Sequence, residues 1–291
     1  MSRALISALT KLVQAPQGRL ASSNLTPAQQ QALDSFAQQS GGVRRQNAGR
    51  GLIYLVTNAE LVSRHLKSLS PASEMTLAPD LPERARNIAR QRNSKSGAHQ
   101  HEIYYLLLKA FEPNVIWRND HGGTLDVSAA TGASGVAALA LSRDDHWYSE
   151  KPLWLVENQA LFDHLHWYPS TLPGALTFYS GHLSNLLIDW LAARPRAREI
   201  ILFPDYDGVG LMNYARLCER GIENCSFWLM PDWKRLMGEF GSRLVWQNTL
   251  TQFMPAVERL RVLSRSPELC ELIQFMHDNS LALEQESIWL A

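Results

Sequence analysis

Two aspartates separated by one residue open the sequence DYDGVG, which runs from Asp205 to Gly210. On an extended strand end, residues i and i+2 point the same way, so we expect the carboxylates of Asp205 and Asp207 to face one spot. Close carboxylates repel each other, and a divalent cation relieves that repulsion. Oxygen ligands favour Mg²⁺ or Mn²⁺ over Zn²⁺, and Gly208 permits a tight turn into a helix. The motif therefore predicts a divalent-cation site.

Short apolar runs predict the strands that must position this motif. The runs are LWLVEN (153–158), ALTFYSG (175–181), EIILFPDYDGVG (199–210) and CSFWLMP (225–231), and the helical sequences LSNLLIDWLAAR and LMNYARLCERG lie between them. Alternating strands and helices predict βαβ units and a parallel sheet, and functional groups gather at the carboxyl ends of such strands. Glu157 ends the first run, where it could complete the metal site or act as a general base.

The charge of the chain is divided unequally. Residues 1–100 contain 13 Lys and Arg against 5 Asp and Glu, whereas residues 101–291 contain 15 against 23, although the formal net charge is zero. This asymmetry indicates a front part that binds a polyanion and a back part that binds cations. Two solvated surfaces of opposite charge are the simpler alternative.

The front part has the pattern helix, basic hairpin, helix. We predict helices over Thr26–Gln39 and from Asn58 to about Leu69. Between them, VRRQN and LIYLV flank AGRG and predict a β-hairpin with Arg44, Arg45 and Arg50 near its tip. The pattern is winged-helix-like, and wings of this kind often contact the DNA backbone.

A second basic cluster follows SLSPASEMTLAPDLP (68–82), which we interpret as a linker. The sequence ERARNIARQRNSKSG predicts a basic helix whose cations offer several donors to phosphate oxygens. These cations are Arg84, Arg86, Arg90, Arg92 and Lys95. After them, EIYYLLLKAF (102–111) is expected to form a buried helix.

Composition excludes several classes of protein. With 45% hydrophobic residues the chain is not disordered. Its apolar runs are shorter than the ~18 residues of a membrane helix, and its N-terminus lacks the apolar stretch of a signal peptide. Cys218, Cys225 and Cys270 form no C-x-x-C pair, which favours core cysteines in a reduced, cytoplasmic compartment.

The order of strands and acids over roughly residues 150–235 resembles the Toprim domain of topoisomerases, primases and some nucleases. This resemblance implies a Rossmann-like parallel sheet in which Glu157 is the glutamate after the first strand and Asp205 and Asp207 bind metal. Asp232, after the fourth strand, and His182, after the second, are weaker candidates for the same cleft.

A longer resemblance links the chain to the Toprim nuclease subunit of SMC-type plasmid-defence systems (Wadjet JetD, or MksG), relatives of the topoisomerase VI A subunit and Spo11. The sequences that carry it are RQRNSKSG, YYLLLK, LVENQALF, FPDYDGVGLMNYARL and ALEQESIW. It implies that Glu284 and Glu286, in a terminal acidic motif, supplement the metal site. It also implies Mg²⁺- or Mn²⁺-dependent hydrolysis of double-stranded DNA.

The same resemblance implies partners and a domain plan. The partners are an SMC-type complex (a condensin-like ATPase, a kleisin and accessory subunits) and a second copy of the chain, since cutting two strands needs two sites. We expect a nucleoid-associated protein with an α/β fold. Its regions are a winged-helix-like DNA-binding region (1–70), a basic helix with a connecting α/β segment (71–150), and a Toprim catalytic domain with a C-terminal helical tail (151–291).

Three other functions stay open. A transesterase would need a tyrosine nucleophile, and Tyr54 in the hairpin and Tyr104 and Tyr105 after the basic helix are candidates, although the latter pair is expected in the core. The D-x-D motif also evokes haloacid dehalogenase-type phosphatases, but Val209 occupies the position of their threonine. The third alternative is a non-catalytic DNA-binding adaptor whose acidic cluster is an interface.

Overall fold

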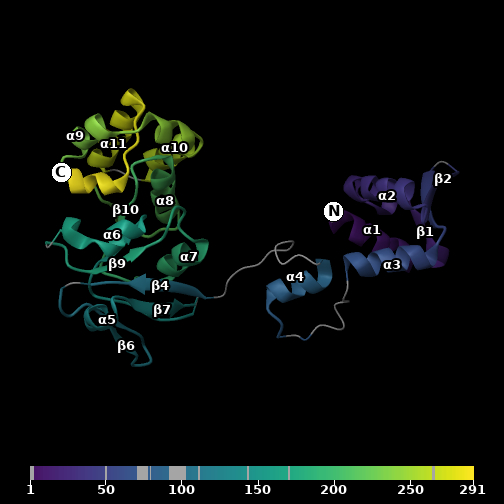
Figure 1. The fold of residues 1–291 in the computed structure, drawn as a ribbon, viewed down its shortest axis with the longest axis horizontal. Coiled ribbons are helices and arrows are strands. Elements are labelled where there is room, and N and C mark those ends of the chain that lie inside the picture. Colours follow the sequence, from purple (N-terminus) through teal and green to yellow (C-terminus); the bar gives the residue numbers. More distant parts are fainter. Residues whose placement is uncertain are drawn as a thin grey trace. The chain divides into compact units, whose positions relative to one another are not determined.

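The structure, a computed structural model, divides the chain into two compact units, Met1–Gln100 and His101–Ala291 (Figure 1). The residues it describes are 3–49, 51–70, 78, 80–91, 103–110, 112–142, 144–169, 171–263 and 266–291. No helix within these ranges combines the length and the apolar character that crossing a membrane requires.

The first unit packs helices against a three-stranded antiparallel sheet of order β1-β3-β2. Its elements are α1 (Arg3–Gln14), β1 (Arg19–Ala21), α2 (Pro27–Ser40), β2 (Val43–Ala48), β3 (Gly51–Val56), α3 (Ala59–Leu69) and α4 (Glu83–Gln91), with short 3₁₀ turns at Pro16–Gly18 and Ser22–Asn24. Leu9, Leu12, Leu33, Phe36 and Val62 form the centre of its core.

The predicted helices and hairpin of this unit are confirmed. Thr26 caps α2 through a reciprocal pair of hydrogen bonds with Gln29, and Asn58 caps α3 by accepting from the backbone of Leu61. Arg44 and Arg45, however, lie at the start of β2, opposite Leu55 and Tyr54, and not near the tip of the hairpin. Gln46, Asn47 and Ala48 of β2 separate Arg45 from the turn at Gly49.

The basic helix predicted after the linker is present as α4, Glu83–Gln91. Arg84 is exposed, whereas Arg86 is half-buried and donates from Nε to the carbonyl oxygen of Leu81 over 3.0 Å. The side chain of Arg90, and Arg50, Arg92 and Lys95 entirely, lie outside the described residues.

The second unit begins with antiparallel strand pairs: β4 with β7, and β5 with β6. Its first elements are β4 (Tyr104–Leu108), β5 (Ile116–Arg118), β6 (Thr124–Asp126), α5 (Val127–Ser134) and β7 (Ala137–Leu141). The buried helix predicted over 102–111 is therefore wrong. Leu106 and Leu108 are buried and Tyr105 is 68% exposed, which is the two-residue alternation of a strand. A continuous apolar run does not reveal that period.

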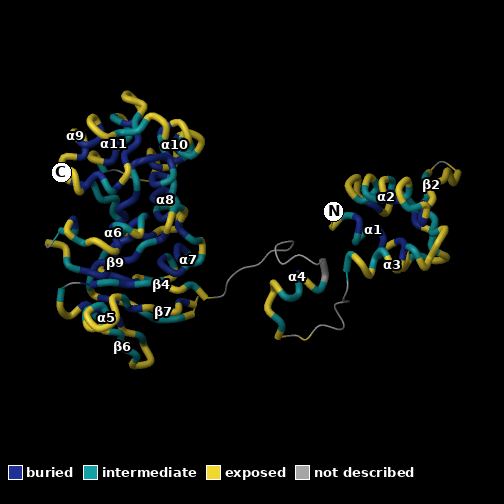
Figure 2. Tube along the Cα trace, viewed as in Figure 1, coloured by how far each residue is buried: buried dark blue, intermediate teal, exposed yellow. Residues whose placement is uncertain are grey.

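The four predicted strands of the parallel sheet are confirmed. They are β8 (Leu153–Val156), β9 (Ala175–Phe178), β10 (Ile200–Phe203) and β11 (Cys225–Phe227), with α6 (Gln159–Asp163), a 3₁₀ turn (Leu165–Trp167), α7 (Asn185–Ala193) and α8 (Gly208–Glu219) between them. All pairs are parallel, in the order β11-β10-β8-β9. Every residue of β8 and β10 is buried (Figure 2), as expected for a sheet covered on both faces.

This strand order creates a topological switch point. The chain passes from β8 to its neighbour β9 on one side, and then to β10 on the other side of β8. The connection that follows β8 leads to one side of the sheet, and the connection that follows β10 leads to the other side. Ligands typically bind in the crevice between two strand ends whose connections leave in opposite directions. Helices α9 (Trp233–Phe240), α10 (Arg243–Leu263) and α11 (Pro267–Asn279) and the final 3₁₀ helix η5 (Gln285–Leu290) complete the unit. α10 packs along α8 (Figure 1).

Candidate functional site

The acids predicted from the sequence meet at the switch point. Glu157 follows β8, and Asp205 and Asp207 follow β10. The backbone N–H of Asp205 donates to Oε2 of Glu157 over 3.3 Å. Glu157 is 7% exposed and Asp207 6% exposed, while Asp205 is half-buried. Burying several carboxylates close together is costly and calls for a compensating positive charge.

Asp207 is also the N-cap of α8, and its Oδ1 accepts from the backbone N–H of Gly210 over 2.8 Å. Gly208 and Gly210 follow, and both positions need glycine because neighbouring backbone atoms leave no room for a Cβ. Neither has the positive φ of left-handed backbone. A Cβ on Gly208 would lie 2.0 Å from the carbonyl oxygen of Thr249 in α10, and one on Gly210 would lie 2.1 Å from that of Asp205. The motif thus determines both where the two carboxylates lie and how closely α8 packs against α10.

Burial and mutual repulsion raise the pKa values of these acids. Burial, then the charges of Asp205 and Asp207, raise the pKa of Glu157 to about 8. Burial chiefly raises the pKa of Asp205 to about 7, with hydrogen bonding from Gln285 opposing it. Burial likewise raises the pKa of Asp207, while hydrogen bonds from Gly210 and Val209 lower it. Perturbed carboxylates of this kind are typical of functional sites.

The C-terminal segment brings two further acids to the cluster. Leu283 and Tyr206 form an antiparallel bridge with N–H···O distances of 2.8 and 3.1 Å. Glu284, exposed, and Glu286, half-buried, are thereby close enough for their charges to raise the pKa of Asp205. The two terminal acids lie beside the site, although they are about 80 residues away in sequence.

Tyr179 and Asn213 also support the cluster and were not predicted from the sequence. Tyr179, directly after β9, donates from its hydroxyl to Oε2 of Glu157 over 3.3 Å. Asn213 of α8 is fully buried and holds the adjoining loop by donating to the carbonyl oxygen of Gly181 and accepting from the N–H of Leu183. Tyr179 occupies a strand end, as Glu157 does, which is a signal that could have identified it. Asn213 carries no such signal.

The two weaker candidates differ in their placement. His182 lies in the loop that Asn213 holds, is exposed, and its charge lowers the pKa of Asp207. It therefore borders the cluster. Asp232 is exposed at the start of α9 with a left-handed φ of 52°, and among the described residues it makes no side-chain bond to the cluster.

The donor set fits a hard divalent cation in its chemistry. The hydrogen bonds to Glu157 and Asp205 fall on one oxygen of each, Oε2 and Oδ1 respectively, so the second oxygen of each carboxylate can serve a ligand. In the part of the chain that the structure describes, no three His, Cys, Asp or Glu side chains are already gathered closely enough to hold a metal ion. Binding would therefore require rotation of these side chains.

Three arginines of the first unit, Arg19, Arg44 and Arg45, lie on strands and occupy the two opposite faces of its sheet. Arg45 pairs with Asp34 of α2, with Nη1 and Oδ2 3.0 Å apart. Arg44 and Arg19 both lie opposite Leu55 in β3 and therefore share the other face. Both are exposed, and neither forms an ion pair with any residue that the structure describes. Arg19 was not predicted, because β1 has only three residues and no strand pattern of its own.

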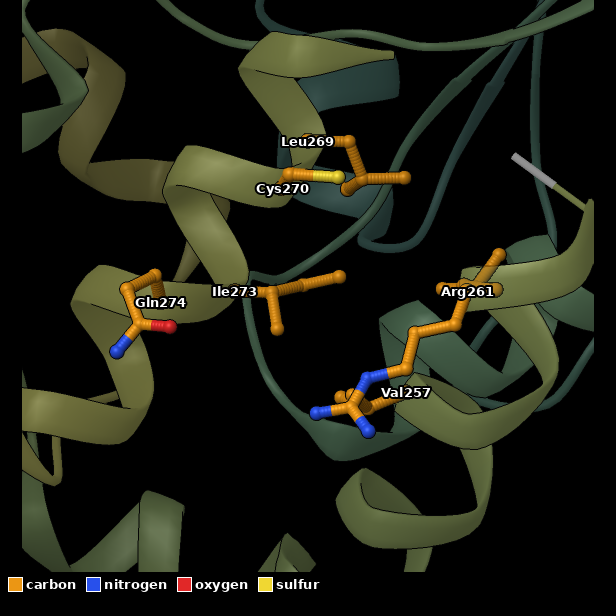
Figure 3. A pocket seen from close by; sticks show the side chains of 7 residues that line it. Val257, Arg261, Leu269, Cys270, Ile273 and Gln274 are labelled. Carbon is orange, nitrogen blue, oxygen red and sulfur yellow. The ribbon is translucent and has the colours of Figure 1, made fainter. Parts of the chain in front are cut away.

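A cavity of about 160 Å³ lies elsewhere, between α10 and α11 (Figure 3). Its lining residues are Val257, Leu260, Arg261, Leu269, Cys270, Ile273 and Gln274. None of the predicted site residues lines it. Cys270 is exposed and was wrongly expected in the core, whereas Cys218 and Cys225 are half-buried, and all three are free thiols.

Residues 120–290, more than half of the chain, match the profile of a protein family described as a domain of unknown function, DUF7281. The matched region contains the parallel sheet and every acid of the cluster. No curated protein matches the chain.

Proposed function

We propose that this chain, which belongs to the DUF7281 family, is a metal-dependent endonuclease that hydrolyses phosphodiester bonds of double-stranded DNA. The observation that carries the proposal is the meeting of Glu157, Asp205 and Asp207 at the switch point of a parallel sheet, where burial raises their pKa values. Such a cluster suits a dication and the phosphate that the dication recruits.

Glu157, Asp205 and Asp207 would hold Mg²⁺ or Mn²⁺, with Glu284 and Glu286 beside them. A bound dication would polarise the scissile phosphate and stabilise the departing oxygen. Alternatively, Glu157 would accept the proton of the attacking water as a general base, because its carboxylate is held beside Asp205 by the backbone N–H of that residue. Tyr179 holds Oε2 of Glu157, which leaves Oε1 for that transfer.

The first unit supports DNA as the substrate. Arg19 and Arg44 present two cations on one face of its sheet, and Arg84 is exposed on α4. Phosphate contacts of this kind are independent of DNA sequence and hold the duplex while chemistry occurs elsewhere. The winged-helix interpretation of this unit is part of the proposal.

Hydrolysis is favoured over tyrosine transesterification. Tyr54 is 1% exposed and donates its hydroxyl proton to Oδ1 of Asp34 over 2.9 Å. Burial, aided by Asp34, raises the pKa of Tyr54 to about 12. Burial also raises the pKa of Tyr104. Tyr105 is exposed, and it makes no contact with the acid cluster among the described residues.

The resemblance to the plasmid-defence nucleases extends the proposal to partners. We propose that the chain works as a homodimer with an SMC-type complex at the nucleoid, as the motifs Phe203–Leu217 and Ala282–Trp289 suggest. A Toprim identity for the sheet domain belongs to the same proposal.

Cleavage of supercoiled plasmid in Mn²⁺ tests this function. The matched control is Asp205→Asn/Asp207→Asn, which removes charge while retaining side-chain size and the cap on α8. We expect nicked or linear DNA from the natural sequence and none from the control, with product ends free of bound protein. Equal cleavage by both proteins would contradict the metal site, and protein-linked ends would favour transesterification. If neither protein cuts alone, the assay is repeated with the SMC-type complex, and failure there would contradict the proposed activity.

A further inference from the structure

Gln285 contacts both of the strand ends that carry the acid cluster. Its side chain is fully buried. The side-chain Oε1 accepts from the backbone N–H of Asn158, and Nε2 donates to the carbonyl oxygen of Phe203. The N···O distance is 3.4 Å in both hydrogen bonds. The backbone N–H of Gln285 donates to Oδ1 of Asp205 over 2.8 Å.

These contacts begin where the sheet ends. β8 and β10 are paired as far as Val156 and Phe203, and the segments beyond that pair carry Glu157 and Asp205. Asn158 is the residue after Glu157, and Phe203 lies two residues before Asp205. The amide of Gln285 therefore ties the two strand ends together at the point where the backbone ladder no longer does.

The chemistry of an amide suits this position. One end donates and the other accepts, so both backbone groups are satisfied by a single neutral side chain. A carboxylate in its place would face the carbonyl oxygen of Phe203 and add negative charge beside Glu157 and Asp205. An apolar side chain would remove both of these hydrogen bonds. The neutral residue between Glu284 and Glu286 is thus the one that enters the protein interior.

The segment that presents Gln285 is held on two sides. Ala282 bridges Ser242, with N–H···O distances of 2.8 and 3.2 Å, and Leu283 bridges Tyr206. Both bridges lie within three residues of Gln285, so its position is fixed relative to α10 and to the D-x-D loop.

We propose that Gln285 is a positioning residue that sets the spacing of Glu157 and Asp205 and thereby the affinity of the site for a divalent cation. The inference rests on the proposed function, since it assumes that these acids bind metal. Residues that orient metal ligands typically change metal affinity or activity by about 10- to 100-fold when replaced.

Mn²⁺ binding to the full chain, measured by electron paramagnetic resonance, tests the inference. The variant is Gln285→Met, which keeps the length of the side chain and removes its polar atoms. The control is Ser287→Ala, because Ser287 is buried in the same 3₁₀ helix but its hydroxyl contacts Sδ of Met230. We expect Kd to rise about 10-fold or more for Gln285→Met and to stay within twofold for Ser287→Ala. Equal affinities for the two variants would overturn the inference.

Hydrogen exchange without metal separates this inference from the proposed function. Backbone amides at 157–160, 203 and 205–207 should exchange faster in Gln285→Met than in Ser287→Ala. Unchanged exchange would show that Gln285 does not hold the two strand ends together and would overturn the inference. A natural chain that binds no Mn²⁺ would overturn the proposed function, and with it the role of Gln285 in affinity. If Gln285→Met does not fold, Gln285→Asn, which keeps the amide but shortens its reach, takes its place in both measurements.

Discussion

The backbone N–H of Asp205 donates to the carboxylate of Glu157 over 3.3 Å, although the two residues are 48 positions apart. The bond crosses from the carboxyl end of β10 to that of β8 and joins two acids whose carboxylates repel each other. Burial raises the pKa of both carboxyl groups. The buried acids thus destabilise the folded chain locally, at the crevice where a parallel sheet typically binds its ligand.

Replacement of Asp207 should separate its two roles. Asp207→Ala removes both the charge and the cap of α8, and lost caps typically cost about 1 kcal/mol. Asp207→Asn removes only the charge, since Asn caps a helix as well as Asp does. We expect both variants to lose cleavage, and only Asp207→Ala to have a lower free energy of unfolding in a denaturant titration. Equal destabilisation by both would show that the carboxylate charge itself stabilises α8.

The free energy of unfolding without divalent cations should fall between pH 5 and pH 8. The folded-state pKa of Glu157 is about 8, above its ordinary value of 4.5. The folded chain therefore binds more protons than the unfolded chain in this interval, and stability is lost as pH rises through the folded pKa. Thermal unfolding in a chelator at several pH values measures the slope. Glu157→Gln should flatten it and Mn²⁺ should restore stability at pH 8, whereas a rise in stability from pH 5 to pH 8 would contradict the raised pKa values.

DNA binding should depend on Arg19 and Arg44 more than on Arg45. The first two share an exposed face of the sheet, whereas Arg45 is already paired with Asp34. Each lost phosphate contact should reduce the slope of log K against log salt by about 0.9. We expect Arg19→Ala/Arg44→Ala to weaken binding and reduce the slope by about 1.8, measured by fluorescence anisotropy with a duplex. A larger effect from Arg45→Ala would place the DNA on the opposite face.

The glycine after Asp207 should tolerate no side chain. A Cβ at Gly208 would lie 2.0 Å from the carbonyl oxygen of Thr249, so Gly208→Ala must push α10 away from α8. Overpacking of this kind costs about 1–3 kcal/mol. Gly238→Ala is the matched control, because nothing lies within 4 Å of its Cβ position in α9. Chemical denaturation should show a loss for Gly208→Ala and a small gain for Gly238→Ala. Equal effects would mean that the close approach at Gly208 does not constrain the fold.

Much of the sheet domain was predictable because its signals are local. β8 and β10 are short apolar runs that each end in an acid, and α8 begins at a glycine-rich turn after such a run. β4 was missed because the letters YYLLL are apolar throughout, and only its pairing with β7 shows which side chains are buried.

The supports of the site could not be predicted in the same way. The roles of Gln285 and Asn213 depend on contacts with backbone groups between 30 and 127 residues away. No spacing within their own segments marks them. The acids themselves were identifiable because a parallel sheet brings the ends of its strands to one edge whatever lies between them.

A calorimetric titration of the full chain with Mn²⁺ at pH 8, beside Asp205→Asn/Asp207→Asn, tests whether the acid cluster binds a divalent cation. The acid cluster should bind at least one Mn²⁺ per chain and release protons as it does so, because cation binding lowers the raised pKa values of Glu157 and Asp205. The double variant should show neither effect. Binding of equal strength to both proteins, or no binding to the natural sequence, would contradict a divalent-cation site at the ends of β8 and β10.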